Sequence, residues 1–220
     1  MSAGNKQPEA MRPAPGLVLA SGSSIRRTIL ENAGIPFRVR AASSDEPDPI
    51  AGEDAEAYVL RAAEAKARAA LGEHPDIGSD LVIGCDQVVR FEGRILRKVA
   101  TPEAAVERLA QLATGPHELV NGLVILRRES IADRVALRTS SIVRLRLRPL
   151  PRPVLERYIA LERPLSSVAC YFLEGAGMTL IEELAGDWFS ALGLPLRPVV
   201  STLLEHGWQP FPGSDREPAP

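Results

Sequence analysis

The stretch LVLASGSSIRRTILENAG (residues 17–34) is typical of a strand, a turn and a helix in immediate succession. Its first four residues form an apolar run of the kind found in buried strands, and the hydroxyl residues that follow favour turns and helix caps. Ile25, Ile29 and Leu30 fall on one helical face, and Gly34 stands where a glycine commonly ends a helix. A buried strand that leads directly into a helix is a building unit of α/β proteins.

Apolar runs continue to alternate with helical patterns along the rest of the chain. The further strands that we expect are residues 36–42, 81–91, 95–98, 117–128 and 139–150. The further helices that we expect are residues 54–71 with Asp54 as cap and Gly72 as stop, a helix opened by Thr101 and Pro102, and residues 153–161 and 198–205. A tight turn joins the strands at 81–91 and 95–98, whereas helices separate other strands. The sequence therefore predicts an α/β fold with a mixed twisted sheet and flanking helices.

Length, charge and cysteine content restrict the class of protein. The 220 residues include 26 Lys and Arg against 28 Asp and Glu, and a formal net charge of −2 argues against a nucleic-acid partner. No apolar run approaches the roughly 20 residues of a membrane helix, and no secretory signal opens the chain. Cys85 and Cys170 have apolar neighbours and are expected to be buried thiols in the cytoplasm. We expect disordered tails at 1–15 and 208–220 around one domain at 16–207.

Hydroxyl residues and two arginines follow the first strand. Ser21, Ser23 and Ser24 lie where the strand turns into the helix, and Arg26 and Arg27 fall in the first helical turn. Backbone N–H groups at a helix start bind anions, and arginine forks add charge and geometry suited to phosphate. Arginine there opposes the helix dipole, which a bound anion would offset. The pattern indicates a phosphate-binding turn; the alternative is a serine-capped helix with solvated arginines.

Asp86 stands inside the apolar run LVIGCDQVVRF. A carboxylate in a buried strand is costly unless it is paired or bound to a cation, and Gln87 beside it points to the opposite face. Asp86 is therefore a candidate metal ligand or general base, or alternatively an aspartate that caps a turn.

Three weaker signals complete the set. Asp45, Glu46 and Asp48 form an acidic loop after an expected strand, Lys98 ends another, and Glu174 stands beside a glycine. Each of these has an ordinary interpretation as a solvated side chain. Together these residues supply a phosphate-binding Ser/Arg turn, carboxylates that could hold a divalent cation, and a lysine. Such a combination suits the hydrolysis of a phosphoanhydride.

The order of these motifs resembles the Maf family of nucleotide pyrophosphatases. The similar segments run in order over about residues 16–207 and include LVLASGSSIRRTILENAGIPF, the pair Asp45-Glu46, EAKA around Lys66, LVIGCDQVV, GRILRK, YIALERPLSSVACYFLEGAG and GDWFSALGLPL. The resemblance implies an α/β fold with two lobes around a central cleft, similar to inosine triphosphatases, in a cytoplasmic and often dimeric protein. It also implies a divalent-metal-dependent enzyme that splits nucleoside triphosphates into a monophosphate and pyrophosphate.

The same resemblance assigns roles to single residues. Asp86 matches the general base, Glu46 an acidic residue near the metal and the attacking water, and Lys98 the lysine of a G-K-P motif. The expected cofactor is Mg²⁺ or Mn²⁺ held by Glu46 and Asp86. The residues that match the triphosphate-binding set are Ser21, Ser23, Arg26, Arg27 and Lys66.

Base choice is linked by the resemblance to Ile25, Gln87 and Glu174. The D-Q and E-G pairs of this chain resemble the branch that prefers 7-methyl-GTP, not the one that prefers dTTP and UTP. The chain departs from the family pattern in Arg97-Lys98-Val99 for G-K-P, in Ile25 for a tryptophan and in Asn121 for a small hydroxyl residue.

Two other functions are weighed against this enzyme. One is a catalytically weak nucleotide-binding protein that influences cell division. The other is a single-stranded nucleic-acid binder that uses Arg144, Arg146 and Arg148, although no aromatic residue interleaves with these arginines.

Overall fold

A computed structural model of the chain describes residues 15–41, 47–48, 50, 52–78, 80–129 and 133–211. Its strands are β1 (Leu17–Leu19), β2 (Arg38–Val39), β3 (Leu81–Phe91), β4 (Arg94–Leu96), β5 (His117–Arg127), β6 (Arg134–Leu147) and β7 (Ile181–Ala185). Its α-helices are α1 (Ser24–Asn32), α2 (Ala55–Glu73), α3 (Pro102–Leu112), α4 (Arg152–Glu162), α5 (Trp188–Ala191) and α6 (Leu196–Glu205). Two short 3₁₀ helices, η1 (Pro75–Ile77) and η2 (Ala176–Leu180), complete the described elements.

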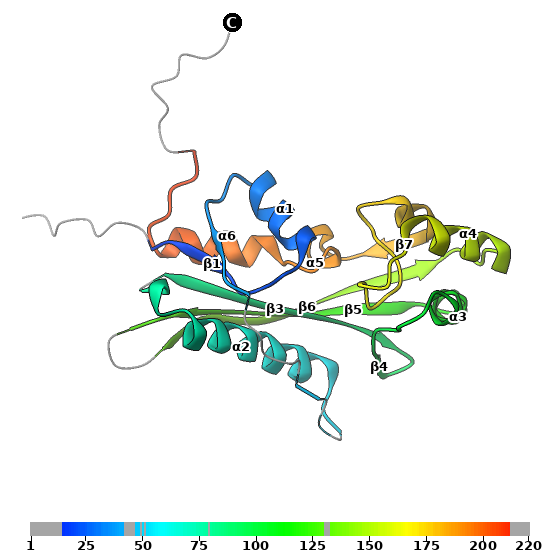
Figure 1. Cartoon of the computed structure of the whole chain (residues 1–220), viewed down its shortest axis with the longest axis horizontal. Coiled ribbons are helices and arrows are strands. Elements are labelled where there is room, and N and C mark those ends of the chain that lie inside the picture. The colour runs from blue at the N-terminus through cyan, green and yellow to red at the C-terminus, as the bar shows by residue number, and fades with distance from the viewer. Residues whose placement is uncertain are drawn as a thin grey trace, which may run out of the picture.

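The strands form one seven-stranded mixed sheet in the order β2-β1-β3-β5-β6-β7, with β4 paired to β3. β1 runs parallel to both β2 and β3, whereas the pairs from β3 through β7 are antiparallel. Helix α2 covers one face of the sheet, and α1, α5 and α6 cover the other (Figure 1). The predicted mixed α/β fold is confirmed.

Two of the clusters of buried residues lie toward the two ends of the sheet. One cluster joins β1, α1 and α6 through Leu19, Leu30 and Val199. Another joins α3 and α4 to the far end of β6 through side chains that include Leu109 and Leu155. Figure 1 shows α3, α4 and β7 at one end of the sheet and α1 and α6 at the other. The molecule is thus built as two lobes on a shared sheet.

Several predicted boundaries are confirmed because their signals are local. β3 spans the eleven residues expected, and Asp54 caps α2 by accepting a hydrogen bond from the backbone N–H of Ala57 at 2.8 Å. Thr101 likewise caps α3, with Pro102 as the first helical residue. Glu92 and Gly93, both with positive φ, make the tight turn between β3 and β4.

Other boundaries were wrong. Helix α2 continues through Gly72 to Glu73 and ends at His74, because Pro75 follows and cannot continue the helix. The strand expected at 36–42 is only Arg38–Val39, and α6 begins at Leu196, before Pro198. The strand expected at 95–98 ends at Leu96, so Lys98 lies beyond it. The polar edge strand β7 and the four-residue α5 were not predicted, since neither has a clear apolar period.

None of the helices in the described part of the chain is long and apolar enough to cross a membrane. At the C-terminal end Trp208 still packs against the cluster around β1 and α6, and its backbone N–H donates to Leu203 at 2.9 Å.

His117 is buried in the lobe of α3 and α4, with Nε2 2.7 Å from the Tyr171 hydroxyl. Burial lowers the pKa of His117 from 6.5 to about 4. Between these two pH values the His117 ring therefore binds a proton in the unfolded chain but stays neutral in the folded chain. Folding stability should be full above pH 6.5 and should fall by about 3 kcal/mol toward pH 4.

Chemical denaturation of the wild type and of His117→Gln across this pH range checks the prediction. The variant should show a shallower loss of unfolding free energy, because its side chain does not titrate. Equal pH dependence in the two proteins would exclude His117 as the source.

Candidate active site

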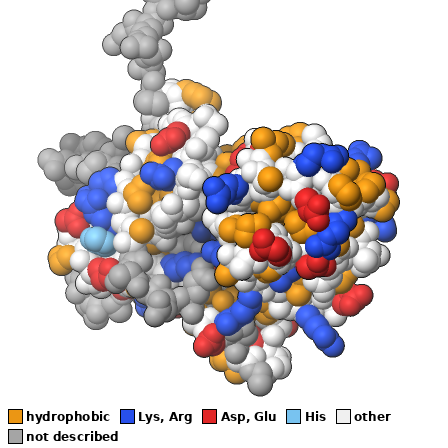
Figure 2. Space-filling model, turned by 45° about the vertical axis from the view of Figure 1, so that its right-hand side comes forward, with side chains coloured by type: hydrophobic (Ala, Val, Ile, Leu, Met, Phe, Trp, Pro, Cys, Tyr) orange, Lys and Arg blue, Asp and Glu red, His pale blue; other side chains and the backbone are white. Residues whose placement is uncertain are grey.

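The middle of β3 is open along one edge. β1 pairs with residues 81–83 of β3, and β4 pairs with residues 89–91 of the same strand. The residues between these two stretches have no strand partner on that side in the described structure. A cleft of about 790 Å³ opens at this gap, and both Asp86 and Gln87 line it. Figure 2 shows the hollow between the two lobes, with Lys and Arg side chains visible in it.

Asp86 lies in this gap, 4% exposed, on the face of the sheet covered by α2. Lys66 of α2 donates from Nζ to its Oδ1 at 2.5 Å, and both side chains line the cleft. Neighbouring Cys85 is buried, which raises the pKa of its thiol to about 11 and leaves it protonated at neutral pH. Cys85 therefore offers no thiolate beside Asp86 at neutral pH.

Two glycines bring α2 close enough for this ion pair. A Cβ on Gly84 would lie 1.9 Å from the backbone oxygen of Ala63, and one on Gly122 would lie 2.2 Å from that of Val59. Gly122 is the cross-strand partner of Asp86, so the helix backbone rests directly on the sheet beside the carboxylate. The close approach lets Lys66 reach Asp86.

The turn after β1 forms a second wall of the cleft. Ser23 caps α1, and the Ser21 hydroxyl accepts a hydrogen bond from the backbone N–H of Ser23 at 3.2 Å. In the described structure, the backbone N–H groups of Ser24 and Ile25 at the start of α1 have no partner. Unpaired N–H groups at a helix N-terminus are an anion-binding arrangement.

Arg26 and Arg27, adjacent in sequence, separate in space. Arg26 donates from Nε to the Gly193 carbonyl at 2.8 Å, and from Nη1 to the Cys85 carbonyl at 3.0 Å and the Ser21 hydroxyl at 3.1 Å. Its Nη2 makes no hydrogen bond with any residue that the structure describes, so two donors remain for a ligand. Arg27 is exposed and is not among the residues that line the cleft.

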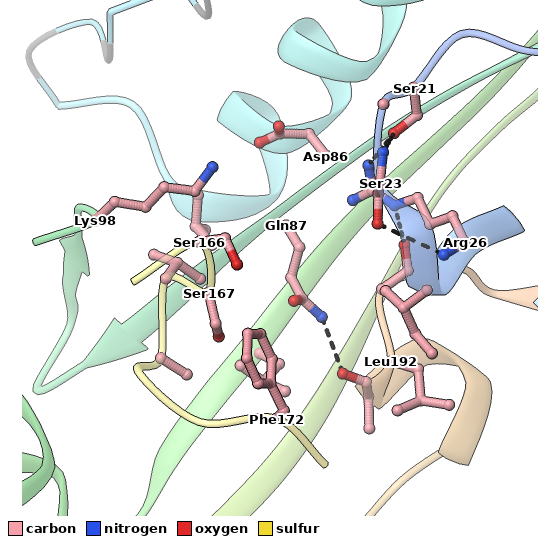
Figure 3. A pocket seen from close by; sticks show the side chains of 18 of the residues that line it. Ser21, Ser23, Arg26, Asp86, Gln87, Lys98, Ser166, Ser167, Phe172 and Leu192 are labelled. Carbon is pink, nitrogen blue, oxygen red and sulfur yellow. Dashed lines mark hydrogen bonds between the residues drawn. The ribbon is translucent and has the colours of Figure 1, made fainter. Parts of the chain in front are cut away.

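The opposite wall carries Lys98 and two hydroxyl residues. In Figure 3 Lys98, Ser166 and Ser167 lie across from Ser21, Ser23 and Arg26, with Asp86 and Gln87 between the two groups. Lys98 is exposed, and Arg97 before it pairs with Asp48 at 2.5 Å. Ser166 and Ser167 were missed from the sequence, although a hydroxyl pair that follows proline in PLSS could have pointed to them.

Gln87 lies on the other face of the sheet from Asp86 and is held by three acceptors. Its Nε2 is 3.1 Å from Oδ1 of Asn121, 3.2 Å from the Ser190 carbonyl and 3.3 Å from the Ala191 carbonyl. The two carbonyls belong to the end of α5, and that of Ser190 also accepts from the backbone N–H of Gly193 at 3.0 Å. The remaining oxygen of Gln87 makes no hydrogen bond with the described residues. Ile25 and exposed Glu174 line the cleft as well.

Glu46 and Asp45 lie outside the described residues. In the described part of the chain no group of three or more His, Cys, Asp or Glu side chains is placed to hold a metal ion. Mg²⁺, however, is commonly bound through one or two carboxylates together with substrate phosphates and water. Asp86 with the phosphates of a ligand would be a donor set of that kind.

The arginines of β6 are engaged with carboxylates. Arg144 contacts Glu118 at 3.0 Å, and Arg146 lies 3.8 Å from Glu183. Alternation along the end of β6 is as predicted, with Leu145 buried between the exposed Arg144 and Arg146. Two of the three arginines of the stripe, Arg144 and Arg146, thus lie beside carboxylates of the same chain.

The fold and the cleft together define an α/β protein with a helix N-terminus suited to a polyanion beside a buried carboxylate–ammonium pair. A family model described as "Maf-like protein" matches residues 16–206. The chain belongs to this family.

Curated relatives match along most of their length. The chain is 38% identical over 200 residues to the "7-methyl-GTP pyrophosphatase" of Rhizobium meliloti, covering 88% of this chain and 97% of that one. It is 36% identical over 191 residues to the "dTTP/UTP pyrophosphatase" of Nitratidesulfovibrio vulgaris, covering 87% and 88%. It is 36% identical over 198 residues to the "Nucleoside triphosphate pyrophosphatase" of Ruegeria pomeroyi, covering 87% and 96%. Relatives with different base preferences in their names are thus about equally similar.

Proposed function

We propose that this protein hydrolyses nucleoside triphosphates to a nucleoside monophosphate and pyrophosphate. The observation that carries the proposal is the meeting, in one cleft, of the N-terminus of α1 with the buried Asp86–Lys66 pair. The first element suits a polyphosphate, and the second suits activation of a water molecule. The names of the family relatives support the same reaction.

In this reaction Asp86 accepts a proton from a water molecule whose oxygen forms a bond to the α-phosphorus. The bond from that phosphorus to the α–β bridging oxygen breaks, and pyrophosphate leaves with the electron pair. The proton passes from Asp86 to solvent, so nucleoside triphosphate and water become monophosphate, pyrophosphate and one proton. Lys66 balances the charge of the buried carboxylate while it acts as the base.

The phosphate charge is met by donors of the two walls. The α1 wall of the cleft supplies Nη2 of Arg26 and the N–H groups of Ser24 and Ile25. Lys98 adds a cation on the opposite wall. Donors already fixed in place stabilise charge that develops in the transition state without reorganising. Ser21 and Ser23 hold the turn in this shape through their own hydrogen bonds. Arg27, exposed on α1, would act only as a distant positive charge.

A divalent cation, Mg²⁺ or Mn²⁺, is part of the proposal, with Asp86 and Glu46 as its protein ligands. When bound, such a cation offsets the negative charge of the triphosphate and of the departing pyrophosphate. We also propose the cytoplasm as the compartment, because Cys85 and Cys170 are both buried, free thiols.

For the base, we propose a guanine, and 7-methyl-GTP in particular. The unpartnered oxygen of Gln87 and the carboxylate of Glu174 are both acceptors that face the cleft. Guanine carries adjacent N1–H and N2–H donors, and a 7-methyl group adds a positive charge that a carboxylate favours. Uracil and thymine offer a single N–H between two carbonyl oxygens, which fits two acceptors less well.

The experiment that tests this function is pyrophosphate release, with Mg²⁺ or Mn²⁺, from 7-methyl-GTP, GTP, dTTP, UTP and 5-methyl-UTP. We expect pyrophosphate and monophosphate in equal amounts, fastest with 7-methyl-GTP. Fastest release from dTTP or UTP would overturn the base preference and leave the reaction standing. Tight nucleotide binding with no release from any of the five would overturn the reaction in favour of a nucleotide-binding protein.

A further inference from the structure

We propose that Asn121 is a positioning residue that locks the Gln87 amide in the orientation set by α5, with its oxygen toward the nucleobase. The inference rests on the proposed function, because it concerns how the same cleft reads its base. Asn121 is fully buried and does not line the cleft, so it would act through Gln87 alone.

The sheet places the two residues side by side. Gln87 of β3 is the cross-strand partner of Asn121 of β5, which is in turn the partner of Ser141 of β6. Cross-strand partners project to the same face, and here that face is the one opposite α2. Ser140, the next residue along β6, points to the α2 face and contacts Glu56 at 3.1 Å.

Gln87, Asn121 and Ser141 form a row across the three strands. The backbone of α5 decides which way the side-chain amides in this row are turned. Two of the three acceptors around Nε2 of Gln87 are the carbonyl oxygens of Ser190 and Ala191, whose identity is fixed by the backbone. An amide turned the other way would put its oxygen against both of them. The nitrogen of Gln87 must therefore face α5, and Asn121 must in turn present its oxygen to that nitrogen.

The amide oxygen of Gln87 is then left for the ligand. In Figure 3 it lies on the side of Phe172, away from the α5 carbonyl that the nitrogen contacts. A glutamine held this way is an acceptor only, and it favours a base edge with N–H donors. The same glutamine with free rotation could present either its oxygen or its nitrogen and would lose that selectivity.

Asn121 holds the second N–H of the amide. The nitrogen of Gln87 carries two hydrogens, and without Asn121 both must be shared by the two carbonyls at the end of α5. Nδ2 of Asn121 and the hydroxyl of Ser141 are both buried, and neither has a hydrogen-bond partner among the described residues. The bond to Gln87 is thus the hydrogen bond that the Asn121 side chain makes in the described structure.

The test is Asn121→Leu, which keeps the volume of the side chain and removes its acceptor. We expect selectivity for 7-methyl-GTP over dTTP to fall about 10-fold, the usual effect of leaving one buried polar group unpaired. The change should appear in the KM for 7-methyl-GTP, with kcat within about 2-fold of the wild type, since Asp86 and the phosphate donors are untouched. Equilibrium binding of both nucleotides without a divalent cation should show the same ratio, independent of turnover.

Controls separate positioning from general damage. Ser141→Ala alters the same row without touching Gln87 and should leave selectivity unchanged. Asn121→Ala replaces Asn121→Leu if the leucine variant does not fold, as judged by thermal unfolding. In a Gln87→Leu background, Asn121→Leu should have no further effect on selectivity, because coupled residues are not additive.

Three outcomes with the variants would overturn the inference. They are an unchanged ratio in Asn121→Leu, an equal loss for both nucleotides, and additive effects in the double variant. Wild-type protein that binds both nucleotides equally would overturn it too. Selective binding with no pyrophosphate release would instead overturn the proposed reaction and leave the role of Asn121 standing.

Discussion

Asp86→Asn is expected to lower kcat for pyrophosphate release by about 10²–10⁴-fold, the share usually carried by a positioned general base. Asparagine keeps the shape of the side chain but cannot accept a proton from water. It also leaves Lys66, which now donates to the carboxylate at 2.5 Å, beside a neutral group. The KM should change less than kcat, because the phosphate donors at α1 and Lys98 are unaffected.

The measurement is steady-state pyrophosphate release from 7-methyl-GTP at saturating divalent cation, with thermal unfolding to show that the variant folds. Asp76→Asn is the matched control, since Asp76 is an exposed carboxylate paired with Arg40 outside the cleft. It should retain nearly full activity. An Asp86→Asn protein with more than about a third of wild-type kcat would rule out Asp86 as the base.

Gly122→Ala is expected to lower the free energy of unfolding by about 3 kcal/mol or more, or to prevent folding. A methyl group there would lie 2.2 Å from the Val59 carbonyl oxygen and 2.8 Å from the Leu60 nitrogen. Both atoms belong to the backbone of α2, so no side-chain rotation can relieve the contact. The helix must move away from the sheet, and Lys66 moves away from Asp86 with it.

Gly72→Ala, in α2 itself, provides the contrast. A Cβ at Gly72 meets nothing within 4 Å, and alanine favours the helix by roughly 0.5–1 kcal/mol. Urea denaturation of both variants should therefore give changes of opposite sign. Gly122→Ala with wild-type stability would mean that α2 does not rest on the sheet as described.

Local signals were enough to predict much of the fold. Asp54 and Thr101 cap their helices as expected, and the apolar run of β3 has the predicted length. Each depends on residues within one or two turns or on one strand, so neighbouring sequence carries the information. Gly72 failed as a stop signal because a glycine ends a helix only where the chain must turn, and here the turn comes at Pro75.

Strand pairing decided what local signals could not. β6 begins at Arg134, five residues before the predicted start, because β5 supplies partners there. β7 has a polar and largely exposed sequence and is a strand because it adds to the edge of β6. A strand with one buried face alternates between apolar and polar residues, but no residue of β7 is fully buried and its sequence has no such alternation.

The sequence by itself determined which residue types could bind phosphate and activate water, and the motifs that carry the family resemblance. Only the tertiary structure decided how they combine. It joined Lys66 to Asp86 across twenty residues, turned Arg26 into the cleft and left Arg27 outside, and set Asn121 against Gln87. Spacing along a chain predicts which side chains share a face of one element. Which elements meet depends on packing and pairing between distant segments, and that is what brings Lys66 within hydrogen-bond distance of Asp86 and sets Arg26 in the same cleft.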